Sequence, residues 1–282
     1  MYEPLDQLID VISPQPTGEL TFTGENMHPA AERVYGGQVL AQCLSAAAAT
    51  VAPERAVHSQ HAYFLSPGNP SVAIDFEVEK ARDGRSFSSR RVVASQGGKT
   101  ILISTLSFQV ASQGEDYQTS MPVVPAPQDL QSERELGLQA NNINEEFMIT
   151  TGQDLDIRVV EPIDWTSAVP REPKLQAWMK TTGPIGDAPG HHEALLAYMS
   201  DAFLIDVCLI THGRVYMDEN LQVASLDHAL WFHSDFRADE WLLHVVEASA
   251  IGGGRGLAHG SFYTSAGQLV ANTVQQGLMR KR

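Results

Sequence analysis

The sequence predicts an α+β fold made of two tandem units, each a long central helix wrapped by an antiparallel sheet. Two observations lead to this expectation. The same order of elements, one helix and then about four strands, occurs twice along the 282 residues, and both helix patterns are apolar on nearly every side. A helix without a polar face must be surrounded by other elements, and the strands that follow it can wrap it.

The first unit begins with a helix pattern at residues 34–50, "VYGGQVLAQCLSAAAAT". Four strand patterns follow it: "VHSQHAYFL", "SVAIDFEVEKA", "SFSSRRVVASQ" and "TILISTLSFQV". Pro-Gly, Asp-Gly and Gly-Gly turn signals separate them, as expected for strands joined by short loops.

The second unit begins with a helix pattern at residues 191–209, "HHEALLAYMSDAFLIDVCL". Its strand patterns are "LQVASLDHALWFH", "EWLLHVVEASA", "LAHGSFYTSAG" and "LVANTVQQGLM". The polar, proline-bearing stretch between the units is typical of a linker. We therefore expect an N-terminal unit at 1–115, a linker at 116–150 and a C-terminal unit at 151–282.

The two units can be aligned by eye. Residues 39–47 lie over 195–203, "HAYF" (61–64) lies over "HALW" (228–231), and 97–105 lie over 266–274. The offsets are 156, 167 and 169 and drift only by loop-sized steps, which indicates one duplicated supersecondary unit. Two such units joined back to back would form a double hotdog, a continuous sheet with two central helices.

Composition excludes several classes of protein. A net charge of −15 argues against nucleic acid as a partner, because phosphate binding needs clustered Lys and Arg. No apolar run approaches the roughly 18–20 residues of a membrane span, and the acidic start "MYEPLDQLID" does not resemble a signal peptide. The only cysteines, Cys43 and Cys208, lie in apolar helix patterns, so we expect no disulfide framework and a cytoplasmic location.

We expect neither a metal nor a cofactor. The histidines of "HSQH" (58–61) fall on opposite faces of a strand, and "HH" at 191–192 has no partners. "GGGRGLAHG" matches neither nucleotide-loop spacing. An anionic small ligand would need a local basic pocket, for which the candidates are 82–91, 252–256 and the terminal "MRKR". Each is also compatible with a solvated surface.

The alignment reveals an asymmetry between the units. Asp201 lies over Ser45, Ser225 over His58, and Gln275 over Leu106, so only the second unit has a carboxylate, a hydroxyl and a carboxamide at these positions. A carboxylate on a buried helix is costly unless it is paired or functional. Asp206 has equally apolar helical neighbours, so spacing alone does not choose between the two aspartates.

The neighbours of Ser225 and Gln275 follow from strand alternation. Unless a bulge intervenes, Ser225 shares a face with Asp227, Ala229 and Trp231. Gln275 shares one with Leu269, Ala271, Thr273 and Met279. A carboxamide there needs partners for its donors and its acceptor, so it is either bonded structurally or holds something polar.

Three further residues are candidates for substrate binding. Gly36 and Gly37 in "VYGGQ" would let a ligand approach the free N–H groups of a helix start, or would serve only a tight turn. His58 lies opposite Ser225 in the alignment and would line the same groove, although a structural histidine is equally compatible with its position.

Several stretches carry a family resemblance: "VYGGQVLAQ", "VHSQHAYFLSPG", "DGRSFSSRRV", "MPVVPAP", "AYMSDAFL", "ASLDHALWFH", "EWLL" and "SFYTSAGQLVANTVQQGLMR". In this order, from about residue 20 to the end, they resemble the acyl-CoA thioesterase II family, double-hotdog thioesterases of bacteria and peroxisomes. The resemblance implies hydrolysis of acyl-CoA to fatty acid and CoA, with Asp201, Ser225 and Gln275 as the catalytic trio. The terminal "RKR" is not the usual peroxisomal tripeptide, which favours a bacterial cytoplasmic member.

In that mechanism Asp201 accepts a proton from a water that Ser225 and Gln275 hold. Direct attack by Asp201 to give an anhydride stays open. One alternative is a hotdog hydratase or dehydratase, although His192 and Asp201 would lie roughly 13 Å apart along one helix. Another is a non-catalytic acyl-CoA-binding module. Exposed sheet edges lead us to expect a homo-oligomer, a dimer or a tetramer.

Overall fold

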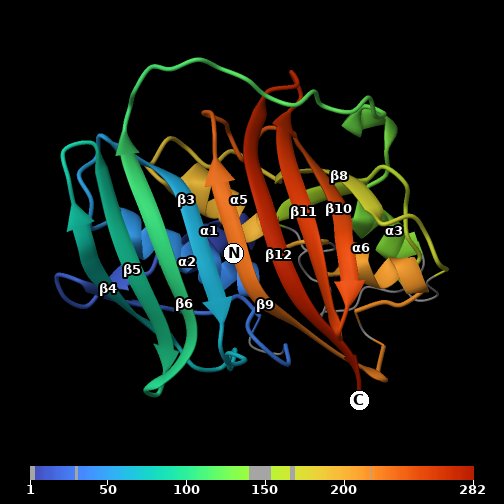
Figure 1. The fold of residues 1–282 in the computed structure, drawn as a ribbon, viewed down its shortest axis with the longest axis horizontal. Coiled ribbons are helices and arrows are strands. Elements are labelled where there is room, and N and C mark those ends of the chain that lie inside the picture. The colour runs from blue at the N-terminus through green and yellow to red at the C-terminus, as the bar shows by residue number, and fades with distance from the viewer. Residues whose placement is uncertain (1–3, 29–30, 140–153, 166–168, 217) are drawn as a thin grey trace.

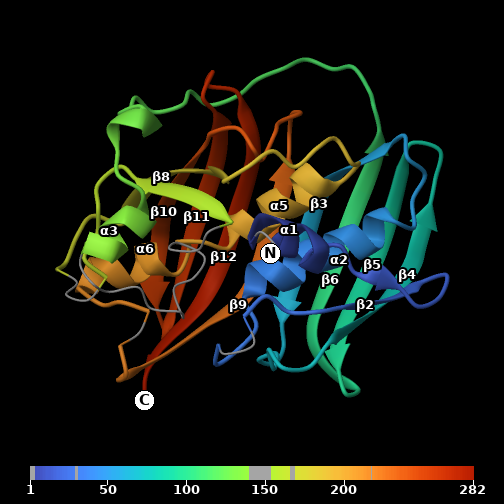
Figure 2. The ribbon, with the colours of Figure 1, turned by 180° about the vertical axis from the view of Figure 1, so that it is seen from behind.

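The computed structural model describes residues 4–28, 31–139, 154–165, 169–216 and 218–282. Within them the chain forms one antiparallel sheet of 12 strands, in the order β1-β2-β4-β5-β6-β3-β9-β12-β11-β10-β8-β7 (Figure 1). Seen from behind, the helices α2 and α5 lie side by side across one face of this sheet (Figure 2). The predicted double hotdog is confirmed.

The elements of each half have the following bounds. The first half comprises α1 (Pro4–Val11), β1 (Gln15–Pro16), β2 (Thr21–Gly24), α2 (Gly36–Ala48), β3 (Arg55–Phe64), β4 (Ile74–Asp83), β5 (Phe87–Gln96) and β6 (Lys99–Val110). The connecting segment holds η1 (Pro127–Asp129) and α3 (Glu133–Gln139). The second half comprises β7 (Leu155–Val159), β8 (Lys174–Thr181), α5 (His191–Ser200), α6 (Asp206–Leu209), η3 (Ile210–His212), β9 (Leu221–Phe232), β10 (Leu242–Gly252), β11 (Arg255–Thr264) and β12 (Leu269–Lys281).

Each half contributes six strands where the sequence predicts about four. The four expected strands of each half form the middle of the sheet, and β3 and β9 join the halves at its centre. The additional pairs, β1–β2 and β7–β8, extend the two outer ends. They precede the central helix of their half, so the pattern of one helix followed by strands does not include them.

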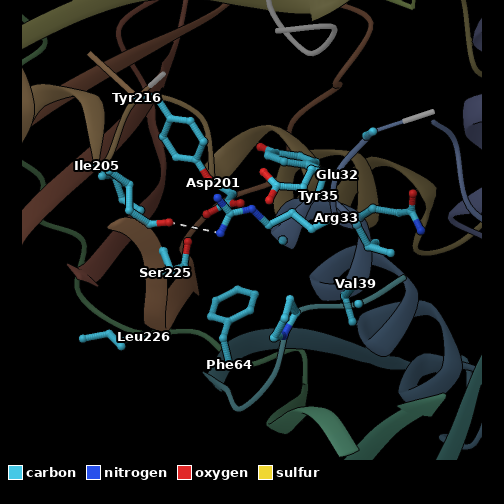
Figure 3. Close-up of a pocket in the computed structure, with 18 of the residues that line it drawn as sticks. Glu32, Arg33, Tyr35, Val39, Phe64, Asp201, Ile205, Tyr216, Ser225 and Leu226 are labelled. Carbon is cyan, nitrogen blue, oxygen red and sulfur yellow. Dashed lines mark hydrogen bonds between the residues drawn. The ribbon is translucent and has the colours of Figure 1, made fainter. Parts of the chain in front are cut away.

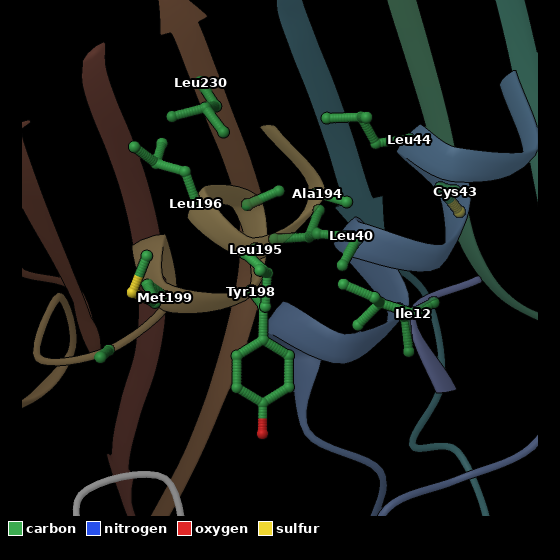
Figure 4. Packing of buried hydrophobic residues seen from close by; sticks show 14 of the residues in the cluster. Ile12, Leu40, Cys43, Leu44, Ala194, Leu195, Leu196, Tyr198, Met199 and Leu230 are labelled. Carbon is green, nitrogen blue, oxygen red and sulfur yellow. The ribbon is translucent and has the colours of Figure 1, made fainter. Parts of the chain in front are cut away.

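The core lies between the two helices and the sheet. Apolar side chains of α2 and α5 meet there with negligible exposure, as Figure 4 shows for Leu40, Leu44, Leu195, Leu196 and Met199. The expectation that both helices are surrounded is therefore met, and burial of such side chains is the main favourable contribution to folding.

The single helix expected at 191–209 is in fact two. α5 ends at Ser200 with Asp201 as its C-cap, and α6 begins at Asp206. Between them Phe203 adopts a φ of 69°, a left-handed conformation that costs a bulky residue free energy. Its ring stacks on Trp165, with centroids 6.1 Å apart. The break places Asp201 at a helix end and Asp206 at a helix start.

The register of the central strands corrects the alignment by one residue. His228 is buried on the inner face and pairs across the strands with Gln275, just as Gln60 is buried and pairs with Leu106. His61, which the alignment placed over His228, is exposed on the outer face beside Trp231. The residue equivalent to His228 is therefore Gln60. A slip of one residue exchanges the two faces of a strand, and sequence similarity alone does not detect it.

The connecting segment covers the outer face of the second half. Trp178 donates its Nε1–H to the carbonyl of Pro125 (3.0 Å), and Thr119 and Tyr263 share a hydroxyl hydrogen bond (2.9 Å). Leu269 packs in this outer cluster and not beside Gln275 as expected, because a register shift next to Tyr263 changes its face. Residues 140–150 of the predicted linker lie outside the described residues, and the division at 115 and 150 stays a prediction.

None of the helices in the described part of the chain is long and apolar enough to cross a membrane.

Candidate active site

A cavity of about 790 Å³ lies where the start of α2, the break between α5 and α6, and the strands β9 and β12 meet (Figure 3). The predicted trio Asp201, Ser225 and Gln275 lines this cavity. Gly36 and Phe64 of the first half line it as well, so both halves of the chain build one site.

Asp201 is held by the start of the helix in the other half. Its Oδ2 accepts the backbone N–H of Gly37 (3.0 Å), at the N-terminus of α2, where the helix dipole favours negative charge. Tyr35, which precedes α2, donates its hydroxyl to the carbonyl of Tyr198 on α5 (3.0 Å), which fixes the two helices relative to each other. Oδ1 of Asp201 is buried and accepts no hydrogen bond from the described residues.

The surroundings make Asp201 more basic than an ordinary aspartate. Burial raises its pKa, and the neighbouring His228, the Gln275 carboxamide and the Gly37 N–H oppose this effect. A partly buried carboxylate with a raised pKa and one unpaired oxygen is suited to accept a proton from a bound water.

A β-bulge brings Ser225 to the inner face of the sheet. The register between β9 and β12 shifts at Leu226, so Ser225 pairs with Gly277 while Asp227 pairs with Gln276. Ser225 therefore faces Gln275. Unbroken alternation would have placed it on the same face as Asp227. Gln275 donates its Nε2–H to Ser225 Oγ (3.3 Å). The bulge thus completes the trio.

His228 is a residue of this site that the sequence did not identify. It is buried and contacts Oε1 of Gln275 through Nδ1 (2.6 Å). The quoted motif "ASLDHALWFH" contains it, but the alignment over His61 concealed that it faces inward.

The two glycines at the start of α2 permit close packing. A Cβ at Gly37 would lie 2.3 Å from the carbonyl oxygen of Tyr198, and a Cβ at Gly36 would lie 2.7 Å from Oδ2 of Asp201. Both distances are below van der Waals contact. The glycines therefore let α2 approach α5 and the carboxylate of Asp201, and Gly36 in addition lines the cavity.

His58 does not join the site. It lies at a bulge of β3, where its Nε2 contacts Ser107 Oγ (2.8 Å) and its ring packs edge-on against Phe87. It is not among the residues that line the cavity. With the corrected register, the residue equivalent to Ser225 is Val57, so the pairing of His58 with Ser225 was an effect of the slipped alignment.

Two arginines line the cavity. Arg282 belongs to one of the three predicted basic segments, whereas Arg33 was missed. Arg33 donates to the carbonyl of Val223 (3.0 Å) and lies over the ring of Tyr216, 5.7 Å from its centroid. Arg90 of the segment 82–91 is buried and paired with Asp83 (2.8 Å), so it has a structural role.

Asp206 supplies a second carboxylate to the cavity wall. Burial raises its pKa to about 6, and the nearby charge of Asp201 adds to the shift. No group of three or more His, Cys, Asp or Glu side chains in the described ranges could hold a metal ion.

Two family models match the chain, an acyl-CoA thioesterase N-terminal domain over residues 10–109 and an acyl-CoA thioesterase over residues 168–278. The chain is 36% identical over 286 residues to acyl-CoA thioesterase 2 of Haemophilus influenzae, covering 99% of both. It is 36% identical to acyl-coenzyme A thioesterase 8 of Mus musculus, covering 96% of this chain and 88% of the relative. Among solved structures, an acyl-CoA thioesterase II from Mycobacterium marinum matches with a TM-score of 0.80 and 36% identity over 98% of each chain. The expected resemblance is confirmed, and the chain belongs to the acyl-CoA thioesterase family.

Proposed function

We propose that the chain hydrolyses acyl-CoA thioesters to a free fatty acid and CoA, with a water held by Asp201, Ser225 and Gln275. One observation carries the proposal. The three side chains come from different elements and line one cavity, in which Oδ1 of Asp201 has no hydrogen-bond partner among the described residues.

The reaction needs one proton to be moved twice. Asp201 takes a proton from the water while the water oxygen attacks the thioester carbonyl carbon. The carbonyl oxygen becomes an oxyanion. When the oxyanion collapses, the C–S bond breaks, and the CoA thiolate takes the proton back from Asp201. General-base assistance of this kind typically accelerates a reaction by roughly 10²- to 10⁴-fold.

Backbone N–H groups in the first turn of α2 would stabilise the oxyanion. A helix start presents unpaired N–H donors, and Gly36 at this start lines the cavity without a side chain. The Gly37 N–H is already bonded to Asp201, so it acts on the base.

The two histidines that could pair with Asp201 in the hydratase alternative, His192 and His228, do not line the cavity. His192 accepts the N–H of Ala238 (3.0 Å) and does not line the cavity. His228 lies next to Asp201, but it is 1% exposed and both its ring nitrogens contact protein groups. Neither can exchange protons with a bound acyl group, which favours hydrolysis.

The arginines of the cavity are suited to the anionic part of the substrate. In a chain with a net charge of −15, Arg33 and Arg282 supply positive charge to the cavity wall, and guanidinium groups match phosphate oxygens well. We place the phosphates of CoA against them.

We also propose a cytoplasmic location, a role in fatty acid metabolism and a homo-oligomer, a dimer or a tetramer. Free, buried Cys43 and Cys208 are compatible with a reducing compartment.

The decisive experiment is release of CoA thiol from short-, medium- and long-chain acyl-CoAs. Wild-type protein is compared with Asp201→Asn and Asp206→Asn, after unfolding measurements show all three to be folded. Turnover that only the Asp201 substitution abolishes supports the mechanism. Absence of wild-type turnover, combined with retained acyl-CoA binding, would indicate the binding module instead.

A further inference from the structure

A buried polar cluster extends from Gln275 of the trio to side chains that do not line the cavity. His228 stands at its centre, with Nδ1 2.6 Å from Gln275 Oε1 and Nε2 3.0 Å from Ser200 Oγ and 3.2 Å from Thr273 Oγ1. All four side chains are at most 1% exposed. Such a cluster is costly to bury unless its groups are mutually satisfied, so its composition calls for a functional reason.

The chemistry of the carboxamide assigns the proton of the imidazole. Oε1 of Gln275 can only accept, so Nδ1 of His228 carries the hydrogen and donates it. Burial lowers the pKa of His228, while the neighbouring Asp201 and Asp227 and the bond to Gln275 act in the opposite direction. Burial lowers the pKa of the nearby His244 to about 3, and the charge of His228 adds to that shift. The neutral imidazole of His228 then has Nε2 as an acceptor facing the two hydroxyl groups.

This bond determines which end of Gln275 faces the cavity. With Oε1 fixed by His228, the amide Nε2 is directed toward Ser225, to whose Oγ it donates (3.3 Å). Ser225 can then direct its own hydroxyl hydrogen elsewhere. If the carboxamide rotated by half a turn, an acceptor would replace the donor beside Ser225, and the hydrogen-bond pattern around a bound water would be reversed.

We propose that His228 is a positioning residue that holds the Gln275 carboxamide in the one orientation that supports water activation. The inference rests on the proposed thioester hydrolysis and adds a fourth side chain to its machinery. His228 does not line the cavity, so it acts through Gln275.

The first half of the chain provides an internal comparison. Gln60 occupies the position equivalent to His228 and is equally buried, but its cross-strand partner is the apolar Leu106. Gln60 donates to the carbonyl of Leu40 on α2 (2.9 Å) and to Ser104 Oγ (3.2 Å). A buried polar residue at this position therefore anchors the helix in one half, whereas in the other it faces a catalytic carboxamide.

The test compares His228→Leu, His228→Asn and Gln60→Leu in the full chain, with kcat, KM and Tm measured for each. His228→Leu should lower kcat by about 10- to 100-fold with little change in KM, because a misdirected group costs rate and not binding. Asn can present its Nδ2 where His has Nδ1, so His228→Asn should recover most of this loss. Gln60→Leu should lower Tm and leave kcat unchanged.

A double-mutant cycle separates positioning from general stability. In a Gln275→Ala background, His228→Leu should cause no further loss of kcat, because the group that His228 orients is absent. An equal loss in both backgrounds, or wild-type kcat in His228→Leu, would overturn the inference while leaving hydrolysis intact. If His228→Leu does not fold, His228→Asn and His228→Gln replace it, and Gln should be the slower because its donor does not reach the Nδ1 position. Absence of turnover in the wild type would instead overturn the proposed function, and the positioning role with it.

Discussion

Gly37 donates its backbone N–H to Oδ2 of Asp201 over 3.0 Å, and this bond joins the two halves of the chain at the candidate active site. The first half supplies the helix start and the second supplies the carboxylate. The duplicated fold therefore has one site of this kind, because the position of Asp201 is Ser45 in the first half and that of Gln275 is Leu106. Neither half holds the whole arrangement.

The close approach of α2 to Asp201 should depend on the absence of a Cβ atom at Gly36. In Gly36→Ala the new Cβ would lie 2.7 Å from Oδ2 of Asp201 and 2.9 Å from the Phe64 ring, so the carboxylate must move. We expect kcat for acyl-CoA hydrolysis to fall by about 10- to 100-fold, since small displacements of a catalytic group cost this much. Gly114→Ala is the matched control, because nothing lies within 4 Å of its added Cβ. Equal rates in both variants would show that the close approach is not required.

Asp201→Asn should remove the base while it keeps the shape of the site. The amide oxygen can still accept the Gly37 N–H, so the fold should persist, whereas kcat should fall by roughly 10²- to 10⁴-fold. Stopped assays of CoA thiol release give the rate. Because burial raises the pKa of Asp201, the activity of the wild type should rise as pH increases through that raised value. A full loss in Asp206→Asn with an active Asp201→Asn would reverse the assignment of the base.

Asp206 should make stability depend on pH. Its pKa is about 6 in the folded chain and 3.8 in the reference state, so the folded state binds its proton more tightly. The free energy of unfolding should therefore decrease as pH rises from about 4 to 6. Above that range the decrease should reach at most about 3 kcal/mol.

Urea unfolding of the wild type and Asp206→Asn at several pH values measures the contribution of Asp206 to the free energy of unfolding. Groups common to both proteins cancel in the difference. The variant should be equal to the wild type near pH 4 and more stable near pH 7. A difference that does not change with pH would show that Asp206 is not the group responsible.

The outcome of sequence reasoning depended on the kind of feature. Strong periodic patterns gave the repeat, the central helices and eight of the strands, and the family resemblance identified three side chains that the fold brings to one cavity. The alignment was one residue out of register, so it missed His228 and misplaced His58. Bulges at His58 and Leu226 change which face of the strand a side chain occupies. Bulges leave no mark in residue type, so alternation cannot locate them. The helix break at Phe203 was hidden for a similar reason, because its left-handed backbone occurs in a residue that normally avoids it.

The two cavity arginines should act on the nucleotide part of the substrate. Arg33→Gln and Arg282→Gln should each raise KM for an acyl-CoA by about 10-fold, since a hydrogen bond to a charged group contributes about 1.5 kcal/mol or more, and added salt should reduce the effect. The same acyl group on a pantetheine thioester lacks the nucleotide phosphates, so its KM should not change. Arg91→Gln is the control, because this arginine is exposed, pairs with Glu79 (3.4 Å) and does not line the cavity. If Arg33→Gln impaired both substrates equally, its bond to the Val223 carbonyl beside Ser225 would be the relevant contact, and Arg33 would support the wall of the site and not the phosphates.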